Sequence, residues 1–143
     1  MKPRLLIADG DADLCHVFQE FLAERGDEVE TAVDGLSCLE KVRWIQPAAL
    51  LLDRELTWGG GDGVLAWLRE ERTTTGPAVV LTATAGYLPD VAADINPPVV
   101  KFLPKPFALR DLLESLQTAV ATKRREDAFN RNGSSARSEL FLG

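Results

Sequence analysis

The chain has 143 residues, of which 45% are hydrophobic and 27% are charged, and its formal net charge is -6. This length and composition suit one globular domain with a short tail, and no stretch is long enough to cross a membrane. The negative charge argues against direct contact with nucleic acid, although it allows a basic partner or a divalent cation. Acidic residues interrupt the N-terminal apolar run too early for a secretory signal, so we expect a cytoplasmic location.

The first half of the chain alternates short apolar runs with amphipathic segments. We predict strands over residues 5–8 and 28–33, separated by a helix that ends at Gly26. A second helix follows over residues 36–45, and a third strand over residues 48–52 leads directly into Asp53. This third run is apolar throughout, which is typical of a strand that is covered on both faces.

The second half continues the alternation. We predict in chain order a helix, a strand, at most a short helix, a strand and a last helix, over residues 63–72, 78–81, 88–95, 99–103 and 109–120. Residues 123–143 lack a periodic apolar face, so they form either an extension of the last helix or a disordered tail. Five strands that alternate with helices indicate an α/β domain with a parallel sheet, in which all the carboxyl ends lie on one rim.

Neither cysteine nor histidine suggests a metal site or a redox site. Cys15 and Cys38 each lie inside a helical pattern, where a reduced cysteine behaves as a small hydrophobic residue. His16 is the only histidine, and a metal site would need more ligands than His16 and its neighbour Cys15. We expect His16 on a helix surface.

Polar residues of complementary chemistry stand where the predicted strands end. The first, third, fourth and fifth strands lead to Asp9, Asp53, Thr82 and Lys105, and Asp11 and Asp13 follow Asp9 closely. Clustered carboxylates suit a hard divalent cation such as Mg²⁺, and a hydroxyl and an ammonium beside it suit a phosphoryl group. The pattern therefore predicts phosphoryl transfer onto Asp53. Taken singly, Asp53 is better explained as a helix cap or turn residue, and Thr82 as a residue that favours strands.

The motifs together resemble the receiver domain of bacterial two-component response regulators, over residues 4–122. They are Leu5-Leu6-Ile7-Ala8-Asp9-Gly10-Asp11, Leu51-Leu52-Asp53, Asp62-Gly63, Val80-Leu81-Thr82-Ala83 and Lys105-Pro106-Phe107. The resemblance implies a flavodoxin-like (βα)5 fold, a doubly wound parallel sheet with strand order 2-1-3-4-5. It divides the chain into a receiver domain over residues 1–122 and a tail over residues 123–143.

The resemblance also implies a role for each matching residue. Asp53 would accept a phosphoryl group from a phosphohistidine on a histidine kinase or a phosphotransfer protein. Thr82 would bond one phosphoryl oxygen and Lys105 would pair with another, while the small Ala83 keeps the site accessible. Phe102 would be an aromatic switch that turns inward as Thr82 moves, although its alternative is a plain core residue. The peptide bond between Lys105 and Pro106 would be cis.

Mg²⁺ is the cofactor that the resemblance implies, and the sequence departs from the family at this point. Asp9, Asp53 and the backbone carbonyl of Glu55 would place the ion, but the second acid of the family's acidic pair is Gly10 here. We therefore expect weakened Mg²⁺ binding. Asp11 is the alternative acid, since Gly10 gives the backbone unusual freedom.

Two segments near the rim also depart from the family. The segment after Asp53 lacks the family's proline, is about two residues longer, and contains Trp58 and three consecutive glycines. Trp58 would cover the site, dock a partner or pack in the core. Pro97-Pro98 replaces the family's small pair before the fifth strand, in a region that usually carries the output surface.

Two functions from different classes remain open. The first is a phosphorylation-controlled switch, which Asp53, Thr82, Ala83 and Lys105 favour. The second is a pseudo-receiver, a binding module that no longer depends on metal and phosphorylation, which Gly10 and the altered loop after Asp53 favour. A dedicated enzyme is disfavoured because no nucleophile is paired with a base, and a receiver assists only its own phosphorylation and dephosphorylation. The partners implied are a sensor histidine kinase or phosphotransfer protein and an unknown output protein, and a homodimer through the fourth and fifth elements is compatible with the family.

Overall fold

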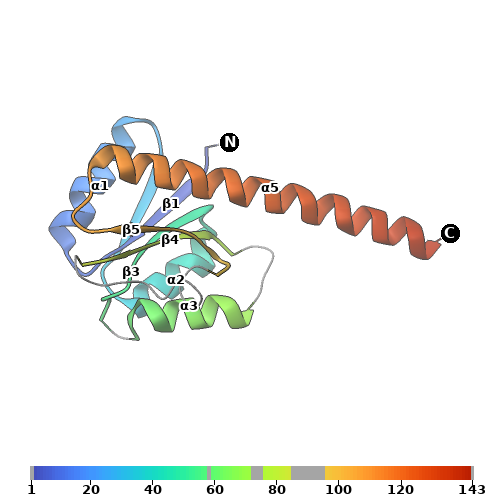
Figure 1. Ribbon diagram of the computed structural model, residues 1–143, viewed down its shortest axis with the longest axis horizontal. Coiled ribbons are helices and arrows are strands. Elements are labelled where there is room, and N and C mark those ends of the chain that lie inside the picture. The colour runs from blue at the N-terminus through green and yellow to red at the C-terminus, as the bar shows by residue number, and fades with distance from the viewer. Residues whose placement is uncertain (1, 58, 72–75, 85–95, 143) are drawn as a thin grey trace.

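Five parallel strands form one sheet, which confirms the predicted α/β fold. The computed structural model describes residues 2–57, 59–71, 76–84 and 96–142, with side chains as far as residue 132. The strands are β1 (Arg4–Ala8), β2 (Glu28–Ala32), β3 (Ala49–Asp53), β4 (Ala78–Ala83) and β5 (Val99–Pro104). They pair in the order β2-β1-β3-β4-β5, which is the flavodoxin-like order expected (Figure 1).

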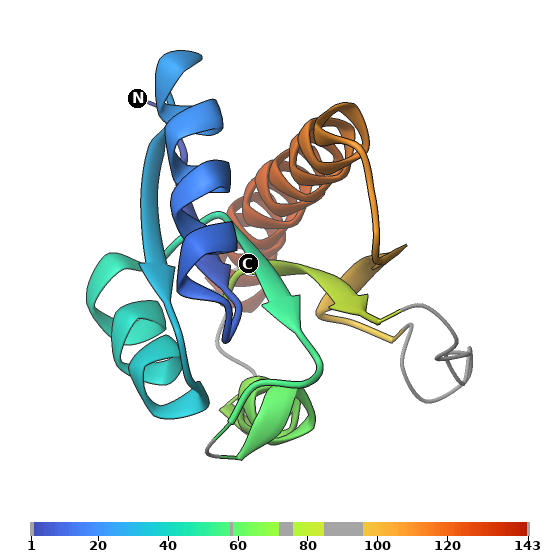
Figure 2. The same ribbon diagram turned by 90° about the vertical axis from the view of Figure 1, so that its left-hand side faces the viewer.

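Helices cover both faces of the sheet, as Figure 2 shows. They are α1 (Ala12–Glu24), α2 (Gly35–Ile45), α3 (Gly60–Glu71) and α5 (Leu109–Leu142). Successive side chains of a strand point to opposite faces. Leu5 and Ile7 therefore pack with α1 and α5, whereas Leu6 and Ala8 pack with α2 and α3. The result is one apolar layer on each face of the sheet. These layers hold the sheet in place and so determine where its rim lies.

Aspartate side chains begin the first two helices. Asp11 caps α1, because its Oδ1 accepts hydrogen bonds from the backbone N–H groups of Asp13 and Leu14 at 3.1 Å each. Asp34 caps α2 by accepting from the N–H of Ser37 at 2.7 Å. Both helices therefore start directly after a strand, close to the rim.

Several predicted boundaries were wrong, two of them close to the rim. β2 ends at Ala32, and Val33 lies beyond it with 44% of its surface exposed. α3 begins at Gly60, three residues before the predicted start, so Gly60 and Gly61 belong to a helix and not to a flexible loop. Sequence patterns missed this start because glycine disfavours helices and these residues show no apolar periodicity. The predicted short helix over residues 88–95 and Trp58 lie outside the described residues.

The last helix continues well beyond the sheet and projects from it (Figure 1). Its apolar residues Leu112, Leu116 and Ala119 are buried against the sheet. Lys123 is also buried, and its Nζ forms an ion pair with Oδ1 of Asp127 at 3.0 Å. Across the described residues, no helix combines the length and the apolar character that a membrane span requires.

The single histidine and both cysteines lie where they were predicted. His16 is exposed on α1, where its Nε2 lies 3.0 Å from Oε1 of Glu20. Cys15 and Cys38 are buried free thiols. Burial is the main cause that raises the pKa of Cys15 to about 11 and the pKa of Cys38 to about 12.

Candidate functional site

Two carboxylates lie buried at the carboxyl ends of neighbouring strands. Asp53 is the last residue of β3, and Asp9 directly follows β1, which pairs with β3. Only 3% of Asp9 and 6% of Asp53 is exposed. A buried pair of carboxylates needs compensating positive charge or hydrogen bonds, since burial of an unpaired charge is costly.

Lys105 supplies that positive charge. Its Nζ lies 2.7 Å from Oδ2 of Asp9 and 3.4 Å from Oδ2 of Asp53. The residue sits directly after β5, and its backbone N–H donates to the carbonyl of Ala83 at 2.8 Å, which continues the pairing of β4 with β5. Its peptide bond with Pro106 is cis, as expected. The structure therefore brings Asp9, Asp53 and Lys105 together as the sequence predicted.

Backbone N–H groups hold the second oxygen of each carboxylate. The N–H of Asp11 donates to Oδ1 of Asp9 at 2.8 Å, and the N–H of Glu55 donates to Oδ1 of Asp53 at 3.0 Å. Each aspartate thus has one oxygen fixed by the main chain two residues further on and the other directed at Lys105. This arrangement orients both carboxylates before any ligand arrives.

Burial and charge act in opposite directions at this site. Desolvation is the main cause that raises the pKa of Asp53, with a further contribution from the charge of Asp9, while the N–H of Glu55 and Lys105 oppose it. Desolvation lowers the pKa of Lys105, but its hydrogen bonds and attraction to Asp9 and Asp53 outweigh this, so that its pKa lies above the ordinary value. Lys105 is therefore a firmly charged ammonium beside a carboxylate that burial makes more basic.

Thr82 lies next to Asp53 in the sheet. The two residues are register partners in the parallel pair β3 and β4, and only 1% of Thr82 is exposed. The carbonyl of Thr82 accepts a hydrogen bond from the N–H of Arg54 at 2.8 Å. Phe102 on β5 pairs with Leu81 on β4 and is half-buried against the layer formed with α2 and α3.

The side chain of Glu55 makes a contact that the sequence did not predict. Its Oε1 accepts from the backbone N–H of Thr84 at 3.2 Å and also from the Thr84 hydroxyl. These hydrogen bonds lower the pKa of Glu55, with the hydroxyl as the main cause. The contact follows from the strand register, because Glu55 and Thr84 each stand two residues after a member of the register pair Asp53 and Thr82.

The residues at the rim offer the oxygen chemistry that Mg²⁺ prefers. Mg²⁺ is commonly bound by one or two carboxylates together with waters, and Asp9 and Asp53 supply two. Asp11 does not join them, because its carboxylate caps α1, and no three His, Cys, Asp or Glu side chains in the described part of the chain gather into a metal-binding group. A Cβ atom at Gly10 would meet only the carbonyl oxygen of Val33, at 3.9 Å, so the backbone there accepts a side chain without a clash at Cβ.

The backbone at the start of α3 lies very close to the backbone of Asp53 and Arg54. A Cβ atom on Gly61 would lie 2.5 Å from Cα of Arg54 and 2.7 Å from the carbonyl oxygen of Asp53. The N–H of Gly61 donates to the carbonyl of Arg54 at 3.1 Å. Gly59 and Gly60 have φ angles of 93° and 66°, a region that favours glycine, and they bring the chain into this position.

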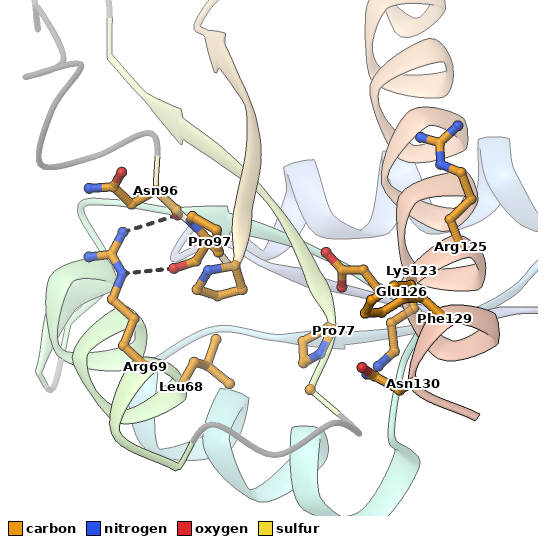
Figure 3. A pocket seen from close by; sticks show the side chains of 12 residues that line it. Leu68, Arg69, Pro77, Asn96, Pro97, Lys123, Arg125, Glu126, Phe129 and Asn130 are labelled. Carbon is orange, nitrogen blue, oxygen red and sulfur yellow. Dashed lines mark hydrogen bonds between the residues drawn. The ribbon is translucent and has the colours of Figure 1, made fainter. Parts of the chain in front are cut away.

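A cavity of about 880 Å³ lies at the other end of the sheet, away from the rim (Figure 3). It is bounded by the end of α3, the residues before β4 and β5, and the part of α5 near Phe129. Arg69 joins two of these walls by donating to the carbonyls of Asn96 and Pro97 at 3.3 Å each. None of the rim residues lines this cavity, so the chemistry expected at Asp53 does not involve it.

Comparisons with known proteins agree with the geometry of the rim. The family model described as the response regulator receiver domain matches residues 5–117. The Response regulator MprA of Mycobacterium bovis is 33% identical over 128 residues, which cover 90% of this chain and 55% of that protein. The Transcriptional regulatory protein PrrA of Mycobacterium leprae is 32% identical over 112 residues, covering 78% and 47%. The chain thus spans about half the length of the curated relatives it matches.

A solved structure gives the same fold. The chain is similar to the response regulator receiver domain protein (CheY-like) from Methanospirillum hungatei JF-1, with a TM-score of 0.74 and 20% sequence identity. The match covers 85% of this chain and 97% of that one. At this level of identity the likeness concerns the arrangement of strands and helices.

Proposed function

The chain belongs to the response regulator receiver domain family, and on this premise we propose that it is a phosphorylation-controlled switch that accepts a phosphoryl group on Asp53. The observation that carries the proposal is the contact of Lys105 with two buried carboxylates at the carboxyl ends of β1 and β3. A carboxylate that is oriented by a backbone N–H and faced by an ammonium is suited to attack phosphorus.

The donor we propose is a phosphohistidine of a sensor histidine kinase or phosphotransfer protein. A carboxylate oxygen of Asp53 forms a bond to phosphorus as the bond between phosphorus and the histidine nitrogen breaks, and the electron pair of that bond stays on the imidazole. Charge in such a transfer is spread over the phosphoryl oxygens. Lys105 then pairs with one of these oxygens, which it can reach from its position between Asp9 and Asp53.

Thr82 and Phe102 would convert the phosphoryl group into a change of surface. Thr82 is the register partner of Asp53, so its hydroxyl needs only a local movement to bond a phosphoryl oxygen. Ala83, which follows it, is small enough to keep the approach open. Phe102 lies on the neighbouring strand and would turn inward as Thr82 moves. Phosphorylation would thereby shift a two-state equilibrium of the output surface.

Asp9, Asp53 and the backbone carbonyl of Glu55 are the groups we propose to hold Mg²⁺. When bound, the ion supplies positive charge to the phosphoryl oxygens. Gly10 withholds one carboxylate from this set, so we expect weaker binding of the ion than a second acid would give. The same glycine favours the alternative function, a pseudo-receiver that binds partners without metal and phosphorylation.

The receiver function would reside in residues 1–122, with residues 123–143 as an extension in which residues 123–142 continue α5. An output protein or segment and a homodimer through the fourth and fifth elements are compatible with this proposal. Contact with DNA is not required of this chain.

Incubation with acetyl phosphate and millimolar Mg²⁺ tests the proposal. Intact-protein mass spectrometry should show one phosphoryl increment on the natural chain and none on Asp53→Asn. Lys105→Met should react much more slowly while it still folds, since oriented charges commonly contribute about a hundredfold or more to such a step. No increment on the natural chain at any Mg²⁺ concentration would favour the pseudo-receiver.

A further inference from the structure

The Glu55 side chain ties the segment after β3 to the segment after β4. Its Oε1 accepts two hydrogen bonds from Thr84, one from the backbone N–H at 3.2 Å and one from the hydroxyl. Both residues are exposed, so these hydrogen bonds are not part of the packing of the core. Two hydrogen bonds between the same two residues restrict the movement of one segment relative to the other.

The contact closes a ring that contains the phosphoacceptor. The N–H of Glu55 donates to Oδ1 of Asp53 at 3.0 Å, and Asp53 is the register partner of Thr82. Thr84 is two residues beyond Thr82 on the same chain. Hydrogen bonds therefore link Asp53 to Glu55 and Glu55 to Thr84, and Thr82 completes the loop as the register partner of Asp53 and through Ala83.

We propose that Glu55 is a positioning residue whose side chain holds Thr84, directly after β4, in its resting place and releases it when Asp53 is phosphorylated. This inference rests on the proposed function, because it concerns the response of the same site. A phosphoryl group adds about −1.5 to −2 charges at neutral pH. Glu55 stands two residues after Asp53 and is tied to it through its own backbone N–H, so we expect the added charge to repel its carboxylate.

The release has a direct consequence for Thr82. Movement of Thr82 toward the phosphoryl group displaces Thr84, which is joined to it through Ala83. While Glu55 holds Thr84, this movement is opposed. Once repulsion weakens the hold, Thr82, Ala83 and Thr84 are free to shift together.

The negative charge of Glu55 is thus separable from its hydrogen bonds. Glu55→Gln keeps an Oε1 that accepts both bonds from Thr84 but removes the charge. Glu55→Ala removes both the bonds and the charge. Thr57→Val is a matched control, because it removes the hydroxyl of another exposed threonine in the same segment.

Amide hydrogen exchange at Thr84, measured by NMR spectroscopy, tests the inference in two stages. In the resting protein, Glu55→Ala should speed exchange about fivefold, the factor that corresponds to one net hydrogen bond. Glu55→Gln and Thr57→Val should stay close to the natural chain. With excess acetyl phosphate, exchange should rise about fivefold in the natural chain and stay slow in Glu55→Gln and in Asp53→Asn.

The outcomes separate this inference from the proposed function. If mass spectrometry shows a phosphoryl group on Asp53 while the Thr84 amide stays protected, the inference is wrong and the proposed function stands. Equal release in Glu55→Gln and in the natural chain would show that charge does not drive it and would also overturn the inference. If no phosphoryl group is taken up, the proposed function fails and the release fails with it, whereas unchanged exchange in resting Glu55→Ala contradicts the inference alone.

Discussion

Replacement of Gly61 by alanine should destabilise the domain although alanine is the better helix former. The new Cβ atom would lie 2.5 Å from Cα of Arg54, 2.7 Å from the carbonyl oxygen of Asp53 and 3.1 Å from the N atom of Arg54. Carbon atoms in favourable contact are about 3.5–4.0 Å apart. All three atoms that it meets belong to the backbone, so no side chain can swing away.

The magnitude follows from two opposing effects. Overpacking typically costs about 1–3 kcal/mol, and three backbone contacts at once place Gly61→Ala at the upper end of that range. Gly→Ala in a helix gains about 1 kcal/mol, which leaves a net loss of about 2 kcal/mol. In a chain of this size that loss lowers the melting temperature by roughly 4–8 °C.

Gly63→Ala provides a matched control in the same helix. A Cβ atom at Gly63 meets no atom within 4 Å, so this variant should keep the gain in helix propensity and be stabilised by up to about 1 kcal/mol. Urea unfolding of both variants at equal protein concentration measures the difference, provided that the m-value is unchanged. If Gly61→Ala proves as stable as Gly63→Ala, the close approach of α3 to Asp53 is wrong.

Three further predictions concern the rim and the buried thiols. Gly10→Asp should bind Mg²⁺ at least about tenfold more tightly by calorimetry, since even outer-shell groups contribute that much and the position is open, whereas Gly63→Asp should leave the affinity unchanged. Burial raises the pKa of Asp53 in the folded state above 3.8, so the native protein keeps a proton that the unfolded chain loses, and stability falls as pH rises through this acidic window. Urea titrations at several pH values measure the unfolding free energy of Asp53→Asn and of the natural chain. The first minus the second should increase with pH between the pKa of Asp53 in the unfolded chain and its higher pKa in the folded protein, and then level off. A difference that does not change with pH would argue against burial as the cause. Cys15 and Cys38, with pKa values of about 11 and about 12, should react slowly with Ellman's reagent at pH 8 and rapidly in denaturant, and fast reaction of the folded protein would contradict their burial.

The gathering of Asp9, Asp53 and Lys105 could be predicted from sequence because two simple rules determine it. Short apolar runs locate buried strands, and parallel connections place their carboxyl ends on one rim. A residue at the end of such a run is then positioned to within a few ångströms without knowledge of any distance. The family resemblance added the role of each residue to this placement.

Other features depend on contacts that no local pattern records. α3 begins at Gly60 because the chain there packs against Arg54, a tertiary cause that outweighs the poor helix propensity of glycine. Asp11 caps α1, so its carboxylate is engaged by the helix and does not join Asp9 and Asp53. This capping depends on where the helix begins. The hold of Glu55 on Thr84 required the register between β3 and β4 to be known.

The most direct test of the account is to locate the phosphoryl group chemically. An acyl phosphate on an aspartate is reduced by borohydride to homoserine, so the natural chain treated with acetyl phosphate and Mg²⁺, then reduced and digested, reports its site by peptide sequencing in the mass spectrometer. The account predicts homoserine at residue 53 and nowhere else. Homoserine at Asp9 or Asp11, or no homoserine in a protein that is folded and binds Mg²⁺, would contradict it.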